Sequence, residues 1–372
     1  MSEKKVVFFP NLDGLRFVAF FSVFLAHSFF TTDPALLGSP LLQGLTFVTS
    51  RGILGVNFFF VLSGFLITYL LLVEKESKGT VNVKYFYFRR FLRIWPLYYA
   101  IVIFGFLVLP WAYGFVGKQL ENSGDLLLYL TFLSNYDKTT GTAILGVLWS
   151  IAVEEQFYLI WPLVFFLVKS KNHAYVFYVI IIFSMIYRIV FEHDPDVLFK
   201  HTVSCISDMA VGGLGAYWAF SGLAQEKLKN FSKSGIALVY LIGLGLILTR
   251  SFWNTAFYGV YASERLIYSL FFLFVVLEQN YAENSLFKMQ SFKWISKLGI
   301  YTYGLYMVHF ISIYFVNLVF DRIGWNKSLF DLIVLETSIA FAGAVLLAIA
   351  SFYVLENPFL KIKSKFSYIV KN

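Results

Sequence analysis

A succession of apolar segments, each long enough or nearly long enough to cross a lipid bilayer, most constrains the fold of this chain. A membrane-spanning helix needs about 20 apolar residues. Along the 372 residues we expect ten such segments, at about 10–30, 52–73, 95–116, 146–168, 174–192, 202–221, 235–250, 262–279, 298–320 and 330–355. Because backbone groups in lipid have to be hydrogen-bonded within the protein, these segments should be helical. The sequence therefore predicts an all-α, polytopic membrane helix bundle of about ten transmembrane helices.

The composition argues against a water-soluble protein. Charged residues make up 14% of the chain and hydrophobic residues 59%, whereas a soluble domain has about 25% charged residues. A net charge of +8 is also found in nucleic-acid-binding proteins, but here the positive residues cluster between apolar segments. We therefore expect the lipid bilayer, and no nucleic acid, as a partner. With Cys205 as the single cysteine, an internal disulfide and a cysteine-based metal site are excluded, and we predict no metal site.

The distribution of Lys and Arg predicts the orientation in the membrane. With the N-terminus in the cytoplasm, the expected cytoplasmic segments carry 20 of these residues and the outer segments 8. The positive-inside rule then places both termini in the cytoplasm. Lys4 and Lys5 precede the first apolar segment, but we expect that segment to be retained as a span because it contains Arg16 and His27.

The chain shows no internal repeat and no soluble domain, so residues 1–372 are expected to form one transmembrane domain. The loops expected at about 31–51, 74–94 and 117–145 are too short to fold alone. The apolar piece 126–133 is too short to cross the bilayer.

Two ionisable residues of the first apolar segment, Arg16 and His27, are the leading candidates for chemistry. They are eleven residues apart, so on a helix they share one face and are separated by about 16 Å, around half the hydrocarbon thickness. Such groups are costly in lipid and face the protein interior or a wet cavity. The alternative is that His27 is only a satisfied interhelical polar group.

The fourth segment contains two adjacent carboxylates, Glu154 and Glu155. Neighbouring helical residues point about 100° apart, so the two cannot serve the same face. The predicted topology puts them at a depth similar to that of His27. A carboxylate bonded to one imidazole nitrogen would leave the other as a general base. We expect His27 to pair with one of the two, and the choice between them is open.

Three arginines, Arg89, Arg90 and Arg93, stand at the cytoplasmic start of the third segment. Arg90 and Arg93 are three residues apart and share a helical face, with Arg89 to one side. Arginine binds phosphate through two parallel hydrogen bonds, which predicts an anion site. Anchoring to anionic lipid headgroups is the alternative.

Other polar residues within apolar segments are possible substrate-lining positions. They are Asn57, Ser63, Trp149, Ser150, Tyr303 and His309. For Asn57 and Ser63 we expect close helix packing first, and a lining position is the alternative. His309 is a rival histidine that either contacts substrate or supports a neighbouring group, and Asp208 is a similar case.

In this order, the motifs resemble those of the acyltransferase-3 family of integral membrane acyltransferases. The matching pieces are 12–16 with His27, 55–67, 89–96 and 149–158, with weaker matches at 303–309 and 356–358. The stretch 204–213 lacks an arginine that this family often shows there.

The resemblance implies about ten helices, an acyl-CoA donor (usually acetyl-CoA) reached from the cytoplasm, and a carbohydrate hydroxyl as acceptor. It implies a catalytic role for His27 and functional roles for Arg16, Arg90 and Arg93. No permanently bound cofactor is expected, and the expected location is a bacterial cytoplasmic membrane.

The resulting hypothesis assigns the coenzyme A phosphates to Arg90 and Arg93, with Arg89 beside them, and donor placement or charge stabilisation to Arg16. His27 deprotonates the acceptor, and an acyl-histidine intermediate is a variant. Two other functions stay open: a proton-coupled transporter or exporter, because intramembrane Arg, His and Glu also suit proton relays, and a structural partner in polysaccharide export.

Overall fold

In the computed structural model, every regular element of the described residues (8–115, 124–139, 141–169, 172–250, 260–363 and 366) is a helix. A helix occupies most of each predicted apolar segment. In the part of the chain that the structure describes, six helical stretches are long and apolar enough to cross a membrane: Pro40–Lys78, Val83–Gly114, Leu145–Leu167, His173–Val190, Thr302–Ile323 and Asp331–Lys363. The all-helical membrane class is confirmed, whereas the count of ten spans and the orientation stay predictions. Lys4 and Lys5, which contribute to the predicted orientation, lie outside the described residues.

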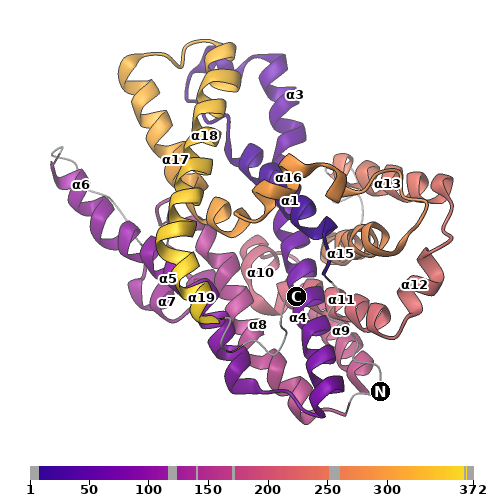
Figure 1. The fold of residues 1–372 in the computed structure, drawn as a ribbon. Coiled ribbons are helices and arrows are strands. Elements are labelled where there is room, and N and C mark those ends of the chain that lie inside the picture. Colours follow the sequence, from indigo (N-terminus) through magenta and orange to yellow (C-terminus); the bar gives the residue numbers. More distant parts are fainter. Residues whose placement is uncertain are drawn as a thin grey trace.

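Among the described residues, ten longer helices form the body of the bundle (Figure 1): α1 (Asn11–His27), α4 (Gly55–Lys78), α5 (Val83–Ile103), α8 (Leu148–Leu167), α9 (His173–Val190), α11 (Thr202–Phe220), α13 (Lys233–Leu248), α15 (Val260–Tyr281), α17 (Thr302–Ile323) and α18 (Thr337–Ser351). The short helices are α2 (Pro34–Leu37), α3 (Pro40–Thr49), α6 (Leu109–Phe115), α7 (Leu126–Leu130), α10 (Pro195–Lys200), α12 (Leu223–Leu228), α16 (Lys293–Gly299) and α19 (Asn357–Lys363). The 3₁₀ turns are η1 (Ser50–Leu54), η3 (Ser134–Tyr136), η4 (Leu145–Val147) and η6 (Met289–Ser291), and the π-helical turns are η2 (Phe104–Val108), η7 (Asp331–Glu336) and η8 (Phe352–Glu356).

Two predicted loops are largely helical. The stretch Pro40–Lys78 runs through α3, η1 and α4 without a break, so the end of the loop predicted at 31–51 was wrong. Likewise α5 begins at Val83, inside the loop predicted at 74–94. The loop between α4 and α5 is short because both helix ends are capped. Gly79 ends α4 with a left-handed backbone (φ 74°), and the Asn82 side chain accepts a hydrogen bond from Tyr85 N at the start of α5.

The buried apolar side chains form two large hydrophobic cores, and helix α1 packs against both of them. Phe20, Val23 and Phe24 are fully buried in one core, and Leu12 and Leu15 are buried in the other. Figure 1 shows α1 near the middle of the bundle, close to α4 and α16. This central position explains how a segment with Arg16 and His27 is accommodated, because its surroundings are protein side chains.

Close packing of α4 on α11 depends on two glycines. A Cβ atom on Gly64 would collide with the backbone of Met209, and one on Gly212 would collide with the backbone of Val61. Small residues let membrane helices approach until their backbones touch. This contact fixes α4 beside α11.

Helix α9 presents one exposed apolar face, as expected of a lipid-facing helix. This face is formed by Tyr175, Val179, Ile182, Phe183, Ile186 and Val190.

A network of buried charges joins α11 to α4 and α15. The fully buried Asp208 carboxylate accepts hydrogen bonds from Arg265 Nε (2.8 Å), Ser269 Oγ (2.8 Å) and Asn57 Nδ2 (3.1 Å). Arg265 lies inside α15, where Asp208 supplies its counter-charge. Asn57 is directed into this network and lines neither of the two cavities described below.

Buried Arg188 of α9 extends the same network to the start of α11, where it donates to Ser204 O (2.7 Å) and Ser207 Oγ (2.8 Å). A guanidinium from a neighbouring helix therefore sits beside the stretch 204–213, which contains no arginine of its own.

Candidate active site

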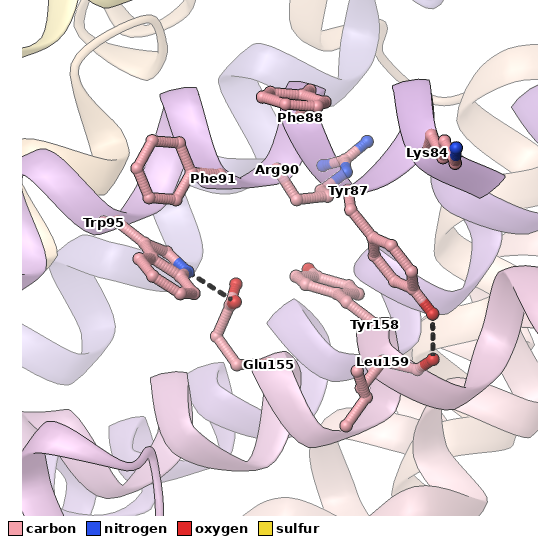
Figure 2. A pocket seen from close by; sticks show the side chains of 9 residues that line it. All are labelled: Lys84, Tyr87, Phe88, Arg90, Phe91, Trp95, Glu155, Tyr158 and Leu159. Carbon is pink, nitrogen blue, oxygen red and sulfur yellow. Dashed lines mark hydrogen bonds between the residues drawn. The ribbon is translucent and has the colours of Figure 1, made fainter. Parts of the chain in front are cut away.

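A cavity of about 420 Å³ lies between α5 and α8, and we call it the α5–α8 pocket (Figure 2). It is lined by Lys84, Tyr87, Phe88, Arg90, Phe91, Trp95, Glu155, Tyr158 and Leu159. Two hydrogen bonds brace its walls: Tyr87 OH donates to Leu159 O (2.6 Å) and Trp95 Nε1 donates to Glu155 Oε2 (3.0 Å). The volume is within the range of about 300–1,000 Å³ that is usual for small-molecule sites.

The three predicted arginines have different surroundings. Arg90 lines the pocket with its guanidinium 5.4 Å from the ring centre of Tyr158, and its buried Nε has no hydrogen-bond partner in the structure. Arg93 makes no hydrogen bond or ion pair with the part of the chain that the structure describes. Arg89, in contrast, donates to Glu74 Oε2 (3.0 Å), so it ties the start of α5 to the end of α4. An anionic ligand in this pocket would meet Arg90 directly, whereas Arg93 follows three residues later on α5 and does not line the pocket.

Arg16 lies in the first half of α1, the half that is nearer to the α5–α8 pocket. Its Nη1 donates to Asp13 Oδ1 (2.7 Å), one turn earlier in the helix. It is also close enough to Arg93 and Tyr158 for electrostatic interaction. The face of α1 that carries Arg16 therefore starts beside the α5–α8 pocket.

The two glutamates point in different directions, as the helical geometry predicts. Glu154 accepts hydrogen bonds from Ser63 Oγ (2.8 Å) and Tyr158 OH (2.8 Å). Glu155 lines the α5–α8 pocket; one carboxylate oxygen accepts from Trp95, and the other is buried without a partner in the structure. Neither glutamate has a hydrogen bond to His27, so the predicted pair was wrong.

A polar face of α8 leads away from the α5–α8 pocket. Ser150, Glu154 and Tyr158 are spaced four residues apart, so they lie above one another along about 12 Å of helix. Tyr158 lines the α5–α8 pocket, whereas Ser150 is hydrogen-bonded to Tyr306 OH (2.7 Å). We call these three residues the α8 polar face.

A second cavity, of about 140 Å³, lies at the far end of the α8 polar face, and we call it the histidine pocket. It is lined by His27, Ile53, Val56, Ala143, Gly146, Val147, Trp149, Phe199, Tyr306 and Phe310. His27 Nδ1 is 3.2 Å from Nε2 of His309, which is fully buried. His309 is therefore the partner of His27. The predicted pair of His27 with a glutamate failed because Glu154 lies too far along α8. It is five residues beyond Trp149, which lines the histidine pocket, and this spacing corresponds to about 7.5 Å along the helix axis.

The other residues that the sequence predicted to line a substrate site have different positions in the structure. Trp149 lines the histidine pocket and Ser150 supports it through Tyr306. Tyr303 OH donates to Ile94 O (2.7 Å), which braces α17 on α5. Tyr158 and Tyr306 were missed in the sequence, although the spacing of Tyr158 from Glu154 and Ser150 was a usable signal. Among the described residues, no group of three or more His, Cys, Asp or Glu side chains could hold a metal ion.

Comparison with known proteins gives a consistent family match. The family model described as "Acyltransferase domain" matches residues 9–356. The chain is 28% identical to the peptidoglycan O-acetyltransferase of Listeria monocytogenes over 315 residues, which are 79% of this chain and 47% of that protein. It is 27% identical to a putative peptidoglycan O-acetyltransferase of Bacillus subtilis over 60% of this chain and 35% of that protein. A putative O-acetyltransferase of Staphylococcus aureus is 31% identical over 43% of this chain and 25% of that protein.

No solved structure matches the chain. The chain spans about half the length of the Listeria relative and about a third of the Bacillus relative.

Proposed function

Because this chain belongs to the acyltransferase-3 family, we propose that it moves a short acyl group, most simply acetyl, from acyl-CoA to a hydroxyl group of a cell-envelope carbohydrate. The single observation that carries this proposal is the arrangement of two pockets at the two ends of one polar route. The α5–α8 pocket offers the Arg90 guanidinium, whose Nε has no hydrogen-bond partner among the described residues, and the histidine pocket offers an imidazole. The α8 polar face and the Arg16–His27 face of α1 run between them.

The α5–α8 pocket suits the donor. Coenzyme A carries several phosphate charges, and the pocket is lined by Arg90, whose buried Nε has no partner among the described residues. Arg93, three residues later on α5, is proposed to meet a phosphate that extends beyond the lining of the pocket. Charge-assisted hydrogen bonds from guanidinium to phosphate are among the strongest in proteins. The aromatic walls, including Trp95 and Phe91, offer stacking surface for an adenine ring. Acyl-CoA is made in the cytoplasm, so in this proposal the pocket faces that side of a bacterial cytoplasmic membrane.

The histidine pocket suits the transfer step. His27 takes the proton of the acceptor hydroxyl while that oxygen forms a bond to the thioester carbonyl carbon. The carbon–sulfur bond breaks, the thiolate of coenzyme A leaves, and the protonated His27 returns the proton to sulfur. An ester and free coenzyme A are the products, so atoms and charges balance. Arg16 is placed to interact with the donor along the route between the pockets.

The acceptor class is proposed from the relatives. Two of them are named as peptidoglycan O-acetyltransferases, one of these putatively, and peptidoglycan sugars carry free hydroxyl groups. A peptidoglycan hydroxyl is therefore the first acceptor to test. The histidine pocket has a volume of about 140 Å³, and a cavity of about 150 Å³ holds a ligand the size of benzene. This volume supports entry of one hydroxymethyl group and a short acyl group rather than a complete substituted sugar residue.

The test combines cells and purified protein. Mass spectrometry of envelope glycans should show one added acyl mass when the chain is expressed and none for His27→Ala. The full chain in lipid nanodiscs should bind acetyl-CoA, and the Arg90→Ala/Arg93→Ala variant should bind it at least about tenfold more weakly. The matched control is Arg322→Ala, an exposed arginine in the last turn of α17, which should bind normally.

Each arm has an outcome that overturns part of the proposal. Identical glycan masses with and without the chain would overturn the carbohydrate acceptor. A purified protein that binds no acetyl-CoA, or a double variant that binds it like wild type, would overturn the donor assignment and favour a transport role.

A further inference from the structure

The contact between His27 and His309 fixes which nitrogen atoms carry hydrogen. His309 Nδ1 is 2.7 Å from the backbone carbonyl of Tyr306, and the carbonyl of Leu305 is a second nearby acceptor. A carbonyl oxygen only accepts, so His309 Nδ1 is the protonated nitrogen of that ring. Its Nε2, in the neutral ring, is then an acceptor. It faces His27 Nδ1 at 3.2 Å.

The same logic continues to His27. Because one hydrogen is shared between His27 Nδ1 and His309 Nε2, His27 Nδ1 donates it. A neutral His27 then has its lone pair on Nε2. An unprotonated nitrogen on a side chain that lines the histidine pocket is what a general base requires.

The surrounding packing holds both rings in this relationship. The ring centroids of His27 and Phe310 are 4.4 Å apart. Phe20 and His309 pack edge to face, with 5.9 Å between their ring centroids. Tyr306, whose carbonyl orients His309, is itself anchored to α8 through Ser150. The hydrogen-bonded chain therefore runs from α8 through α17 to the end of α1.

We propose that His309 is a positioning residue that accepts the Nδ1 hydrogen of His27 and thereby sets His27 in the tautomer with a free Nε2. This inference rests on the proposed function for its catalytic meaning, but the tautomer itself does not depend on it. His309 is fully buried and lines neither cavity, and both of its nitrogens are engaged. His27, which lines the pocket, is therefore the base, and His309 acts through it.

Two substitutions separate positioning from direct catalysis. In His309→Gln the amide oxygen can occupy the position of Nε2 and still accept from His27 Nδ1, but it cannot act as a base. His309→Phe keeps the ring and removes the acceptor. If His309 positions His27, the Gln variant keeps most of the activity and the Phe variant loses about 10–100-fold in kcat, as is usual for supporting hydrogen bonds. The KM for acyl-CoA should change little in both.

The tautomer can be read directly. Nitrogen-15 NMR of the full chain in nanodiscs should show His27 with a protonated Nδ1 and a bare Nε2 in wild type and in His309→Gln. In His309→Phe the Nε2-protonated form of His27 should appear. His173 gives matched controls, because it too is buried and bonds a backbone carbonyl, Val168 O at 3.1 Å. His173→Gln and His173→Phe should leave the His27 signals unchanged.

The two proposals fail in different ways. A wild-type His27 with hydrogen on Nε2 would overturn the positioning role whatever the reaction is. A Gln variant as inactive as His27→Ala, with the His27 tautomer intact, would make His309 the base instead. A protein with the expected tautomer but no acyl transfer would overturn the proposed function and leave the tautomer assignment standing.

Discussion

Glu154 and Glu155, adjacent in α8, lie in separate chemical surroundings. Glu154 accepts hydrogen bonds from Ser63 and Tyr158 within the α8 polar face. Glu155 accepts from Trp95 and lines the α5–α8 pocket beside Arg90. The 100° turn between neighbouring helical residues produces this division. Carboxylates with different surroundings should affect different kinetic constants.

Glu155→Gln should lower the KM for acyl-CoA by about fivefold, which corresponds to about 1 kcal/mol. The substitution removes a negative charge from a pocket proposed to hold phosphates, and the amide oxygen still accepts from Trp95. Glu154→Gln is the matched variant and should leave that KM unchanged, because Glu154 does not line the pocket. Initial rates against acyl-CoA concentration provide the measurement. A fall in KM for Glu154→Gln alone would reverse the assignment.

Arg89→Ala should destabilise the protein without weakening donor binding. Arg89 donates to the largely buried Glu74, and Glu74 also accepts from Asn82 N at the turn between α4 and α5. Loss of one charged hydrogen bond costs about 2 kcal/mol. Thermal unfolding in detergent should therefore begin at a lower temperature than for wild type, while acetyl-CoA titration gives the wild-type affinity. Weaker acetyl-CoA binding with unchanged unfolding would instead return Arg89 to the donor site.

Some of the candidate site was accessible from the sequence, because it depends on local periodicity. Hydropathy locates helices at all ten predicted segments, since lipid permits little other structure. The shared face of Arg16 and His27 and the divergence of Glu154 from Glu155 follow from helical rotation alone. These relationships are internal to one helix and need no knowledge of its neighbours.

Relationships between helices were not accessible. His27 finds His309, 282 residues away, because the ends and depths of α1 and α17 coincide, and a single sequence does not state the depth of one helix relative to another. The ion pair of Arg265 with Asp208 was not predicted either, because it joins α15 to α11 inside the bundle. Arg89 was grouped with Arg90 because the two are adjacent in the sequence. The turn at Gly79, between α4 and α5, places Glu74 next to Arg89, and a single sequence does not show this contact.

The buried pair of Asp208 and Arg265 should show strong coupling in stability. Asp208→Leu or Arg265→Met alone leaves a charge buried without its partner, and each should destabilise by about 3–5 kcal/mol. The double variant should recover part of that loss, since neither charge of the pair is left uncompensated, while buried Arg188 of the same network still loses the Asp208 carboxylate. Thermal unfolding of the four proteins gives the coupling. Additive losses in the double variant would show that the pair does not act as a unit.

Gly146→Val should reduce transfer by filling the histidine pocket. Gly146 lines this pocket, and a Cβ atom there would have no other atom within 4 Å. The added side chain can therefore occupy the cavity without disturbing the backbone. Losing room for even one methylene in a fitted pocket changes kcat/KM by about tenfold or more. Acetyl-CoA affinity should be unchanged, because Gly146 is not part of the α5–α8 pocket. Gly44→Val, at a glycine with equally open surroundings in α3, should leave transfer at the wild-type rate. Wild-type transfer by Gly146→Val would show that the reacting groups do not meet in this pocket.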